Sequence, residues 1–190
     1  LLIMSIQYDV IIVGAGAAGM MSAIEAGKRG RKVLLVDHYK KIGEKIRISG
    51  GGRCNFTNIH TNPNKFISQN PKFVRSALSQ YTQNDFINLI NKYEIKFHEK
   101  KLGQLFCDHS AQQIVDMLLK ECELAKVTIF KEFIIKDVSK DNDQYLILTE
   151  TDTYSSESLV VATGGLSVPK IGATSFGYEI AKKFDHNIIE

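Results

Sequence analysis

The beginning of the chain carries the apolar pattern of a strand, a helix and a second strand. Tyr8 to Val13 is a continuous apolar run that ends at a glycine, which is typical of a strand buried on both faces of a parallel sheet. Ala17 to Gly27 is rich in Ala and Met and predicts a helix, and Gly30 marks its end before a short apolar strand, Val33 to Val36. The pattern therefore predicts a βαβ unit.

The next part of the chain is predicted to be loop-rich and then helical. Lys40 to Asn70 holds a glycine triplet and five asparagines, so a loop is expected apart from a short ordered stretch around Lys45 to Ser49. Two amphipathic helices are predicted to follow. Their apolar positions are Phe73, Ala77 and Leu78 in the first, and Phe86, Leu89, Ile90 and Tyr93 in the second.

Two short strands and a longer helix are predicted next. The strands are Ile95 to His98 and Gln104 to Cys107. Ser110, with Gln113 three residues later, has the spacing of a capping box that opens the helix. The apolar face of this helix is formed by Ile114, Val115, Leu118, Leu119 and Cys122.

The remaining chain turns to β structure and ends in a helix. Five short strands are predicted, at Val127 to Phe130, Phe133 to Val138, Tyr145 to Thr149, Thr151 to Tyr154 and Leu159 to Ala162. The last of them is uniformly apolar, so we expect it to enter the parallel sheet, while the others form an antiparallel meander. A helix is expected near Phe176 to Phe184, begun by Thr174 or Ser175.

Composition and charge narrow the function classes. A length of 190 residues, 44% of them hydrophobic, predicts one globular domain. The net charge of +3 is too small to indicate a nucleic-acid partner, although nine of the Lys and Arg residues, against two acidic ones, lie between Lys28 and Arg53. We interpret Lys28 to Lys32 as a solvated helix end. We expect Lys45, Arg47 and Arg53 to face phosphate.

Other sequence features point to a cytoplasmic protein without a metal. Cys54, Cys107 and Cys122 have neither zinc-ligand spacing nor an even number for disulfides, so a reducing compartment is expected. The longest uncharged stretch, Val10 to Ile24, is shorter than the roughly 20 residues needed to cross a bilayer, and Leu1 to Ile6 lacks the features of a signal peptide.

The first chemical motif is Gly14-Ala15-Gly16-Ala17-Ala18-Gly19, a GxGxxG fingerprint that follows a predicted buried strand and opens a helix. Gly14 permits a tight turn, Gly16 lets a pyrophosphate approach the backbone, and Gly19 lets helix and strand pack closely. Asp37, at the end of the next strand, is placed to accept hydrogen bonds from ribose hydroxyls. This context favours a dinucleotide site over a turn without a ligand.

Two further motifs accompany the fingerprint. Gly43 to Asn58 contains three consecutive glycines followed by Arg53, Cys54 and Asn55. Because such a triplet is costly in conformational entropy, it suggests that a ligand lies against the backbone there. The third motif, Leu159 to Gly165, is a buried strand that ends in Thr-Gly-Gly and continues to Tyr178.

Together these motifs and the LGQLFCDHSAQQIV stretch resemble the YhiN/BaiN-like flavoproteins, a family of NAD(P)/FAD-dependent, aminoacetone-oxidase-like oxidoreductases. The resemblance runs from Tyr8 to the last residue, and GGGRCNFTN is its most specific part. It implies an α/β, Rossmann-like FAD-binding domain of the glutathione-reductase type, with a central parallel sheet and an antiparallel β-meander. Asp37 stands where the family usually has Glu, which shortens the side chain but keeps the carboxylate.

The resemblance also implies roles for individual residues. The fingerprint would hold the pyrophosphate, and Asp37 would hold the ribose. The backbone of Phe133 and Ile134 would hold the adenine. Thr163 to Gly165 would turn back under the pyrophosphate. The complete set of expected FAD-binding residues is Gly14, Gly16, Ala17, Ala18, Gly19, Asp37, Lys45, Gly51, Gly52, Arg53, Cys54, Asn55, Phe133, Ile134, Thr163, Gly164 and Gly165.

Members of this family are about twice as long and have a C-terminal segment that returns to the FAD domain and lines the flavin. We therefore expect residues 1–190 to be an incomplete, C-terminally truncated FAD-binding domain, with a helical excursion at about 62–101. A split gene, a truncated remnant and an excised fragment of a longer protein all remain open, and a separately encoded C-terminal half is an expected partner of the first.

Two functions remain open at this stage. The first is an NAD(P)H-linked flavoprotein oxidoreductase that acts on a small organic substrate, without a nucleic-acid or membrane partner. The second is a non-catalytic subunit that binds a dinucleotide and requires the other half. An RNA-modifying flavoprotein ranks lower because no basic strip interleaved with aromatic residues is evident. No residue is assigned as catalytic, and His98, His109 and Tyr178 are interpreted as structural.

Overall fold

The structure is a computed structural model that describes residues 5–167 and 172–189, and it forms two compact units. The first unit combines the described residues up to Lys45 with those from Leu118 onward, and the second is Ile46–Met117. The helical excursion expected at about 62–101 lies inside the second unit. Val168 to Ile171, which belong to the third motif, lie outside the described residues.

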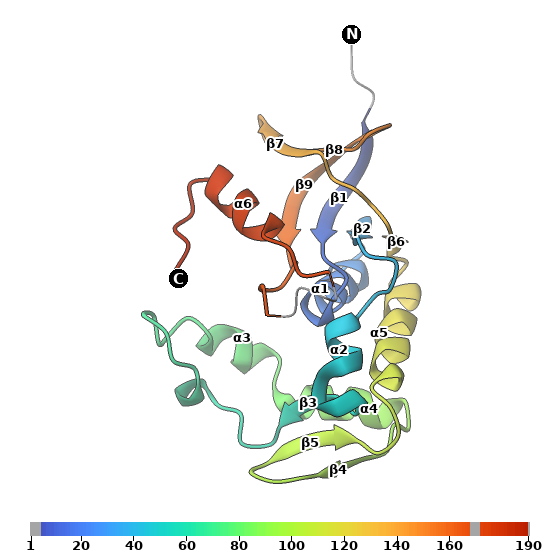
Figure 1. The fold of residues 1–190 in the computed structure, drawn as a ribbon, viewed down its shortest axis with the longest axis vertical. Helices are drawn as coiled ribbons and strands as arrows, with labels where there is room; N and C mark the ends of the chain where they lie inside the picture. Colours follow the sequence, from blue (N-terminus) through green and yellow to red (C-terminus); the bar gives the residue numbers. More distant parts are fainter. Residues whose placement is uncertain (1–4, 168–171, 190) are drawn as a thin grey trace. The chain divides into compact units, whose positions relative to one another are not determined.

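The first unit is built on a six-stranded sheet with the order β6-β2-β1-β9-β8-β7 (Figure 1). Its elements are β1 (Ile6–Val13), α1 (Ala17–Lys28), β2 (Val33–Val36), β6 (Thr128–Phe130), β7 (Asp137–Asp141), β8 (Gln144–Leu148), β9 (Thr153–Val161) and α6 (Phe176–Lys183). Strands β6, β2, β1 and β9 are parallel neighbours, and β9, β8 and β7 are antiparallel. The predicted parallel sheet and antiparallel meander are thus confirmed, within a single sheet.

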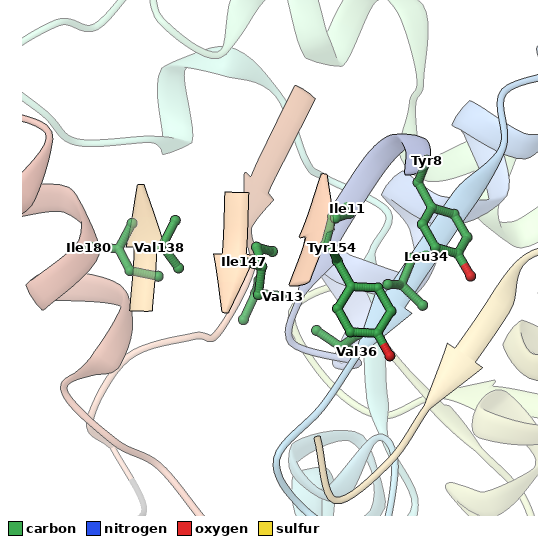
Figure 2. Close-up of a cluster of buried hydrophobic side chains, with 9 residues drawn as sticks. All are labelled: Tyr8, Ile11, Val13, Leu34, Val36, Val138, Ile147, Tyr154 and Ile180. Atoms are coloured by element: carbon green, nitrogen blue, oxygen red, sulfur yellow. The ribbon is translucent and has the colours of Figure 1, made fainter. Parts of the chain in front are cut away.

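Strand β1 is buried on both faces, as its continuous apolar run predicted. Ile11 and Ile12 point to opposite faces and both are fully buried. On the face of Ile11, a core cluster joins the central strands to α6; Figure 2 shows its side chains, with Ile180 of α6 beside Val138 of β7. The α1 helix contributes the buried Met20 and has Cys122 next to it, with the Cys122 thiol 3.8 Å from the Met20 carbonyl.

The later strands differ from the prediction in two places. Thr151 to Tyr154 and Leu159 to Ala162 are parts of one strand, β9, in which the polar Ser155 and Ser156 are buried between β1 and β8. Their polarity hid the continuity, because buried serines interrupt the apolar pattern. The strand predicted at Phe133 to Val138 begins only at Asp137.

The second unit contains a three-stranded antiparallel sheet with the order β3-β5-β4. Its elements are β3 (Asn55–Asn58), α3 (Arg75–Gln80), α4 (Gln83–Lys92), β4 (Phe97–Glu99) and β5 (Gln104–Cys107), with single turns of 3-10 helix at Ser49–Gly52 and Pro63–Lys65. Two further helices, α2 (Glu44–Ile48) and α5 (Gln112–Leu124), include the positions where the chain leaves and re-enters the first unit.

Strand β3 lies in the segment predicted as a loop, so that prediction is wrong there. Asparagine is rare in strands, and β3 forms through its long-range pairing with β5. The capping box is also misplaced. It forms at Thr82 and Asp85, at the start of α4, while the Ser110 hydroxyl accepts a hydrogen bond from the Gln112 N–H rather than from Gln113.

An ion pair between a half-exposed ammonium and a buried carboxylate joins α1 to α5 and gives a stability prediction. The Lys28 ammonium lies 2.8 Å from the Glu121 carboxylate, whose side chain is 1% exposed. Lys28→Met removes a partner of a buried charge and is expected to lower the free energy of unfolding by about 2–3 kcal/mol. Urea unfolding measures the change.

Lys120→Met is the matched control, because the Lys120–Glu123 pair is largely exposed. Exposed pairs contribute less than about 1 kcal/mol, so this variant should unfold almost as the parent does. Equal losses in the two variants would contradict the role given to the Lys28–Glu121 pair.

Candidate dinucleotide site

The glycines of the fingerprint are required by the close approach of backbone segments. Gly14 has a φ of +105°, and a Cβ there would lie 2.5 Å from the Ala162 carbonyl oxygen at the end of β9. A Cβ on Gly19 would lie 1.8 Å from the Gly14 carbonyl oxygen. These distances allow only glycine at both positions, where the turn and the packing of α1 on β1 depend on it.

Gly16 differs, because a Cβ at this position would meet nothing within 4 Å. The residue precedes the first turn of α1, in which Ala17 and Ala18 are exposed. This turn has no acidic residue and no side-chain cap. The helix N-terminus is therefore bare and faces open space, which is the arrangement that binds phosphate groups through backbone N–H groups.

Asp37, at the end of β2, holds the fingerprint loop. One carboxylate oxygen accepts a hydrogen bond from the Ala15 N–H at 2.7 Å, and the other accepts one from the Tyr39 N–H at 2.8 Å. Each carboxylate oxygen has a second lone pair. The same side chain can therefore fix the loop and still accept hydrogen bonds from a ligand.

A cavity of about 320 Å³ lies beside Asp37 and brings together five of the expected site residues. Asp37 is also tied to the wall formed by Phe133 and Ile134, because its carbonyl accepts a hydrogen bond from the Phe133 N–H at 2.9 Å. The lining residues are Val13, Gly14, Val36, Asp37, His38, Phe133, Ile134, Ile135, Thr163, Thr174, Ser175, Phe176 and Glu179.

The other eight residues of this lining were not expected at the site, and four of them, Thr174 to Phe176 and Glu179, lie at the start of α6. The sequence predicted the start of α6 there, and the structure shows Ser175 as the residue before its first turn. The available signal was that this helix is the next predicted element after the Thr-Gly-Gly motif. Helix starts that follow parallel strands often meet at the carboxyl edge of the sheet.

Lys45 is joined to the third motif within the first unit. Its ammonium donates a hydrogen bond to the Gly165 carbonyl at 2.7 Å and lies 3.2 Å from where a Gly164 Cβ would be. Lys45 is exposed, so its charge is available at the surface beside Thr163 to Gly165. The expected phosphate-binding cation and the Thr-Gly-Gly turn are thus neighbours.

The expected residues Gly51 to Asn55 belong to the second unit. Gly50, Gly51 and Gly52 all have positive φ, and a Cβ on Gly51 would meet nothing within 4 Å. The triplet is thus a left-handed backbone segment that is open at Gly51, whereas a Cβ on Gly50 would lie 2.7 Å from the Phe106 ring. Arg53 donates a hydrogen bond to the Asp108 carbonyl, and Asn55 is exposed at the start of β3.

Cys54 lies buried after the triplet and has a neighbour that sequence spacing did not indicate. Pairing of β3 with β5 brings Cys107 close, with the Cys107 N–H bonded to the Arg53 carbonyl. Burial, and secondarily Cys54, raises the pKa of Cys107 to about 11, and burial also raises the pKa of Cys54. Both thiols are therefore protonated at neutral pH and are poor nucleophiles.

The geometry of the first unit fits the adenosine and pyrophosphate parts of FAD. Gly16 leaves space in front of the α1 N-terminus, and the cavity beside Asp37 is bounded by the residues expected for ribose and adenine. Among residues 5–167 and 172–189, no cluster of three metal-ligating side chains is present, and no helix is long and apolar enough to span a membrane.

Comparisons with known proteins agree with this geometry. The family model described as HI0933-like protein Rossmann domain matches residues 8–190. A ribosomal RNA dihydrouridine synthase of Escherichia coli is 54% identical over 96% of this chain and 46% of its own length. A protein of the same name from Haemophilus influenzae is 46% identical over 98% of this chain and 47% of its own length. The chain spans about half the length of these relatives.

A solved structure shows the same fold. The halogenase PltM, in complex with phloroglucinol and FAD, matches with a TM-score of 0.52 and 15% identity, over 94% of this chain and 36% of that one. At this identity the likeness concerns the fold alone. The first unit has the α/β Rossmann-type fold of FAD-binding oxidoreductases, as the sequence predicted.

Proposed function

We propose that this chain, which belongs to the HI0933-like Rossmann-domain family, is the FAD-binding part of a flavoenzyme that reduces uridine to dihydrouridine in ribosomal RNA. The observation that carries the proposal is the 54% identity, over 183 residues, to the ribosomal RNA dihydrouridine synthase of Escherichia coli. Identity at this level over nearly the whole chain favours a common cofactor and a common reaction.

The residues of the first unit are proposed to hold the adenosine and pyrophosphate. The N–H groups of Ala17 and Ala18 face the pyrophosphate across the space left by Gly16. The Asp37 carboxylate accepts hydrogen bonds from the ribose hydroxyls while it keeps its hydrogen bond from the Ala15 N–H. The backbone of Phe133 and Ile134 lies along the adenine, and Thr163 to Gly165 close the pyrophosphate side.

The second glycine motif is proposed to approach the flavin end. Gly51 and Gly52 offer a backbone without side chains, and Arg53 adds positive charge that suits phosphate in the second unit, as Lys45 does in the first. FAD, when bound, supplies the hydride chemistry that reduces a carbon–carbon double bond. This chain's residues position the cofactor, and NAD(P)H is the proposed reductant.

The proposal departs from the small organic substrate and the absence of a nucleic-acid partner that the sequence led us to expect. The two relatives described above are named for ribosomal RNA, and no observation on the described residues favours a small substrate. The need for the remaining half of the protein, whether fused or separate, stays part of the proposal, because each relative is about twice the length of its match.

A chimeric protein tests the proposal. This chain would replace the matching part of the Escherichia coli relative, and the chimera would be expressed in an Escherichia coli strain that lacks the relative. We expect dihydrouridine to return to the ribosomal RNA, measured by mass spectrometry of digested nucleosides. The chimera with Gly16→Val is the control and should leave dihydrouridine at the background of the deletion strain.

The purified chimera is also assayed for bound FAD. A chimera that binds FAD stoichiometrically but restores no dihydrouridine would refute the proposed reaction and leave only a flavoprotein. Restoration by the chimera and not by its Gly16→Val form would support both the reaction and the site.

A further inference from the structure

The second unit exposes a segment in which positive and aromatic side chains alternate. It runs from Ile59 to Tyr81, between β3 and α4, and contains only α3 and one turn of 3-10 helix (Figure 1). We propose that this segment, called the basic-aromatic segment, is a contact surface for single-stranded RNA. The inference rests on the proposed function. It adds a statement of which part of the chain contacts the RNA substrate.

The charge of this region has one sign. From residue 45 to residue 84 the sequence contains six Lys and Arg residues and no Asp or Glu. Three of these cations, Lys65, Lys72 and Arg75, lie in the basic-aromatic segment, and all three are exposed. A segment that carries cations and no carboxylates of its own attracts a phosphate backbone.

Large apolar side chains stand beside these cations without entering the core. Phe66 follows Lys65 and is 43% exposed, and Phe73 follows Lys72 and is 78% exposed. Neither α3 nor the turn at Pro63–Lys65 buries a residue. The sequence predicted that Phe73 and Ala77 would form the buried face of an amphipathic helix, and both are exposed. Rings in this position can stack on bases.

Hydrogen bonds from asparagine side chains fix the backbone that carries these residues. The Asn62 side-chain oxygen accepts a hydrogen bond from the Asn64 N–H at 3.1 Å. The Asn70 side-chain oxygen accepts one from the Lys72 N–H at 3.2 Å. Ser68 donates to the Asn70 carbonyl at 2.8 Å. The cations and rings are therefore presented on shaped turns, which lowers the entropy lost when a ligand binds.

A hollow of about 580 Å³ adjoins the segment and includes one of the cation-ring pairs. It is lined by Asn58, His60, Thr61, Lys65, Phe66 and Leu102. Its volume lies in the range of sites that hold small ligands. Phe66 offers a ring and Lys65 a charge, which match the face and the phosphate of one unstacked nucleotide. The Asn58 amide is held by the Leu102 carbonyl and the His60 N–H, and the Thr61 hydroxyl donates to the Asn58 carbonyl, so these polar groups fix the wall of the hollow.

The composition favours RNA over a protein partner. The buried centre of a protein interface is depleted in charged residues, especially Lys. Here each exposed Phe directly follows a Lys, and the neighbouring positions are rich in Asn, Gln, Ser and Thr. Interleaved cations and aromatic rings on a polar surface are typical of proteins that bind single strands.

Fluorescence anisotropy with a labelled, uridine-rich single-stranded RNA tests the surface on the 190-residue chain. A variant with Lys65→Gln, Lys72→Gln and Arg75→Gln is expected to bind about tenfold more weakly, with the slope of log affinity against log salt lowered by about 2. The double variant Phe66→Ala, Phe73→Ala is expected to bind RNA about tenfold more weakly, with the same salt dependence as the parent chain. Far-UV circular dichroism should show that these exposed changes leave the fold intact.

The matched control replaces the same number of exposed cations in the first unit, through Lys120→Gln, Lys126→Gln and Lys182→Gln. This variant should bind RNA nearly as the parent chain does. RNA binding that is equal in the segment variant and in the control, or that is absent in the parent chain, would overturn the inference. A segment variant that binds RNA normally but, placed in the chimera, forms no dihydrouridine would also overturn the inference. That result would indicate a contact with protein.

The same segment substitutions in the chimera separate this inference from the proposed function. If the chimera forms dihydrouridine and its segment variant forms as much, the surface is wrong and the reaction stands. If the chain binds RNA through the segment while the chimera forms no dihydrouridine, the surface stands and the reaction is wrong.

Discussion

Gly16→Val is expected to abolish FAD binding while the first unit stays folded. A Cβ on Gly16 meets no atom of the described residues within 4 Å beyond its chain neighbours, so a side chain can begin there without displacing the backbone. The backbone at Gly16 has a φ of −85° and a ψ of −168°, an extended conformation that valine adopts readily. The open space is where the pyrophosphate would lie, and the added methyl groups fill it.

The expected loss is at least about a hundredfold in FAD affinity, which corresponds to about 3 kcal/mol. The cost in stability should be about 1 kcal/mol, because valine is a poor residue to precede the first turn of a helix. Titration of flavin fluorescence measures the affinity, and urea unfolding measures the stability. A variant with the FAD affinity of the parent chain would mean that Gly16 serves only the turn.

Gly19→Ala is the contrasting variant. Its Cβ would lie 1.8 Å from the Gly14 carbonyl oxygen, so helix and strand must separate. This change should lower the unfolding free energy strongly, and any loss of FAD would follow from loss of the fold. The two glycines belong to one motif, yet one variant acts on the ligand and the other on the packing.

Local sequence pattern was sufficient to predict those parts of the fold that bury apolar residues continuously. Tyr8 to Val13 and Val33 to Val36 were predicted as buried parallel strands, and the structure confirms both. Asn55 to Asn58 was not predicted, because its strand depends on a partner in β5 that lies far along the chain. Ser155 and Ser156 concealed the length of β9 for the same reason: their burial is a property of the neighbouring strands.

The candidate site divides in a similar way. The roles of Gly14 and Gly19 followed from the spacing of the fingerprint, and the close approaches in the structure agree with them. The hydrogen bond from the Ala15 N–H to Asp37, and the proximity of Cys107 to Cys54, required the fold. The exposed rings beside Lys65 and Lys72 were misjudged because a helical period predicts a face, and the period alone does not show what covers that face.

By itself, the chain is expected to bind FAD weakly and to oxidise little or no NAD(P)H. The residues proposed for the adenosine and pyrophosphate are all in this chain, so part of the affinity should be present. The family resemblance implies that the segment covering the flavin lies in the part of the relatives that this chain does not match. Without that cover the ring stays hydrated, and it loses both apolar burial and the water-excluded surroundings that favour hydride transfer.

The surface of the first unit has an apolar cavity that a further segment could cover. A cavity of about 730 Å³ beside β9 and α6 is lined by Leu159, Val161, Ile180 and Phe184 among others, and Val161 is 42% exposed. An apolar surface of this kind is expected where further segments pack. Adding the remaining part of the Escherichia coli relative as a separate chain should therefore raise both FAD affinity and NAD(P)H oxidation.

The measurement compares the isolated chain with the mixture. The visible absorbance of flavin that stays with the protein after gel filtration reports binding, and the absorbance of NAD(P)H reports turnover. The chain carrying Gly16→Val, mixed with the same partner, should remain colourless, which separates cofactor loading from simple association. Stoichiometric FAD and steady turnover by the isolated chain would show that the residues of this chain are sufficient, and that the flavin needs no cover from another half.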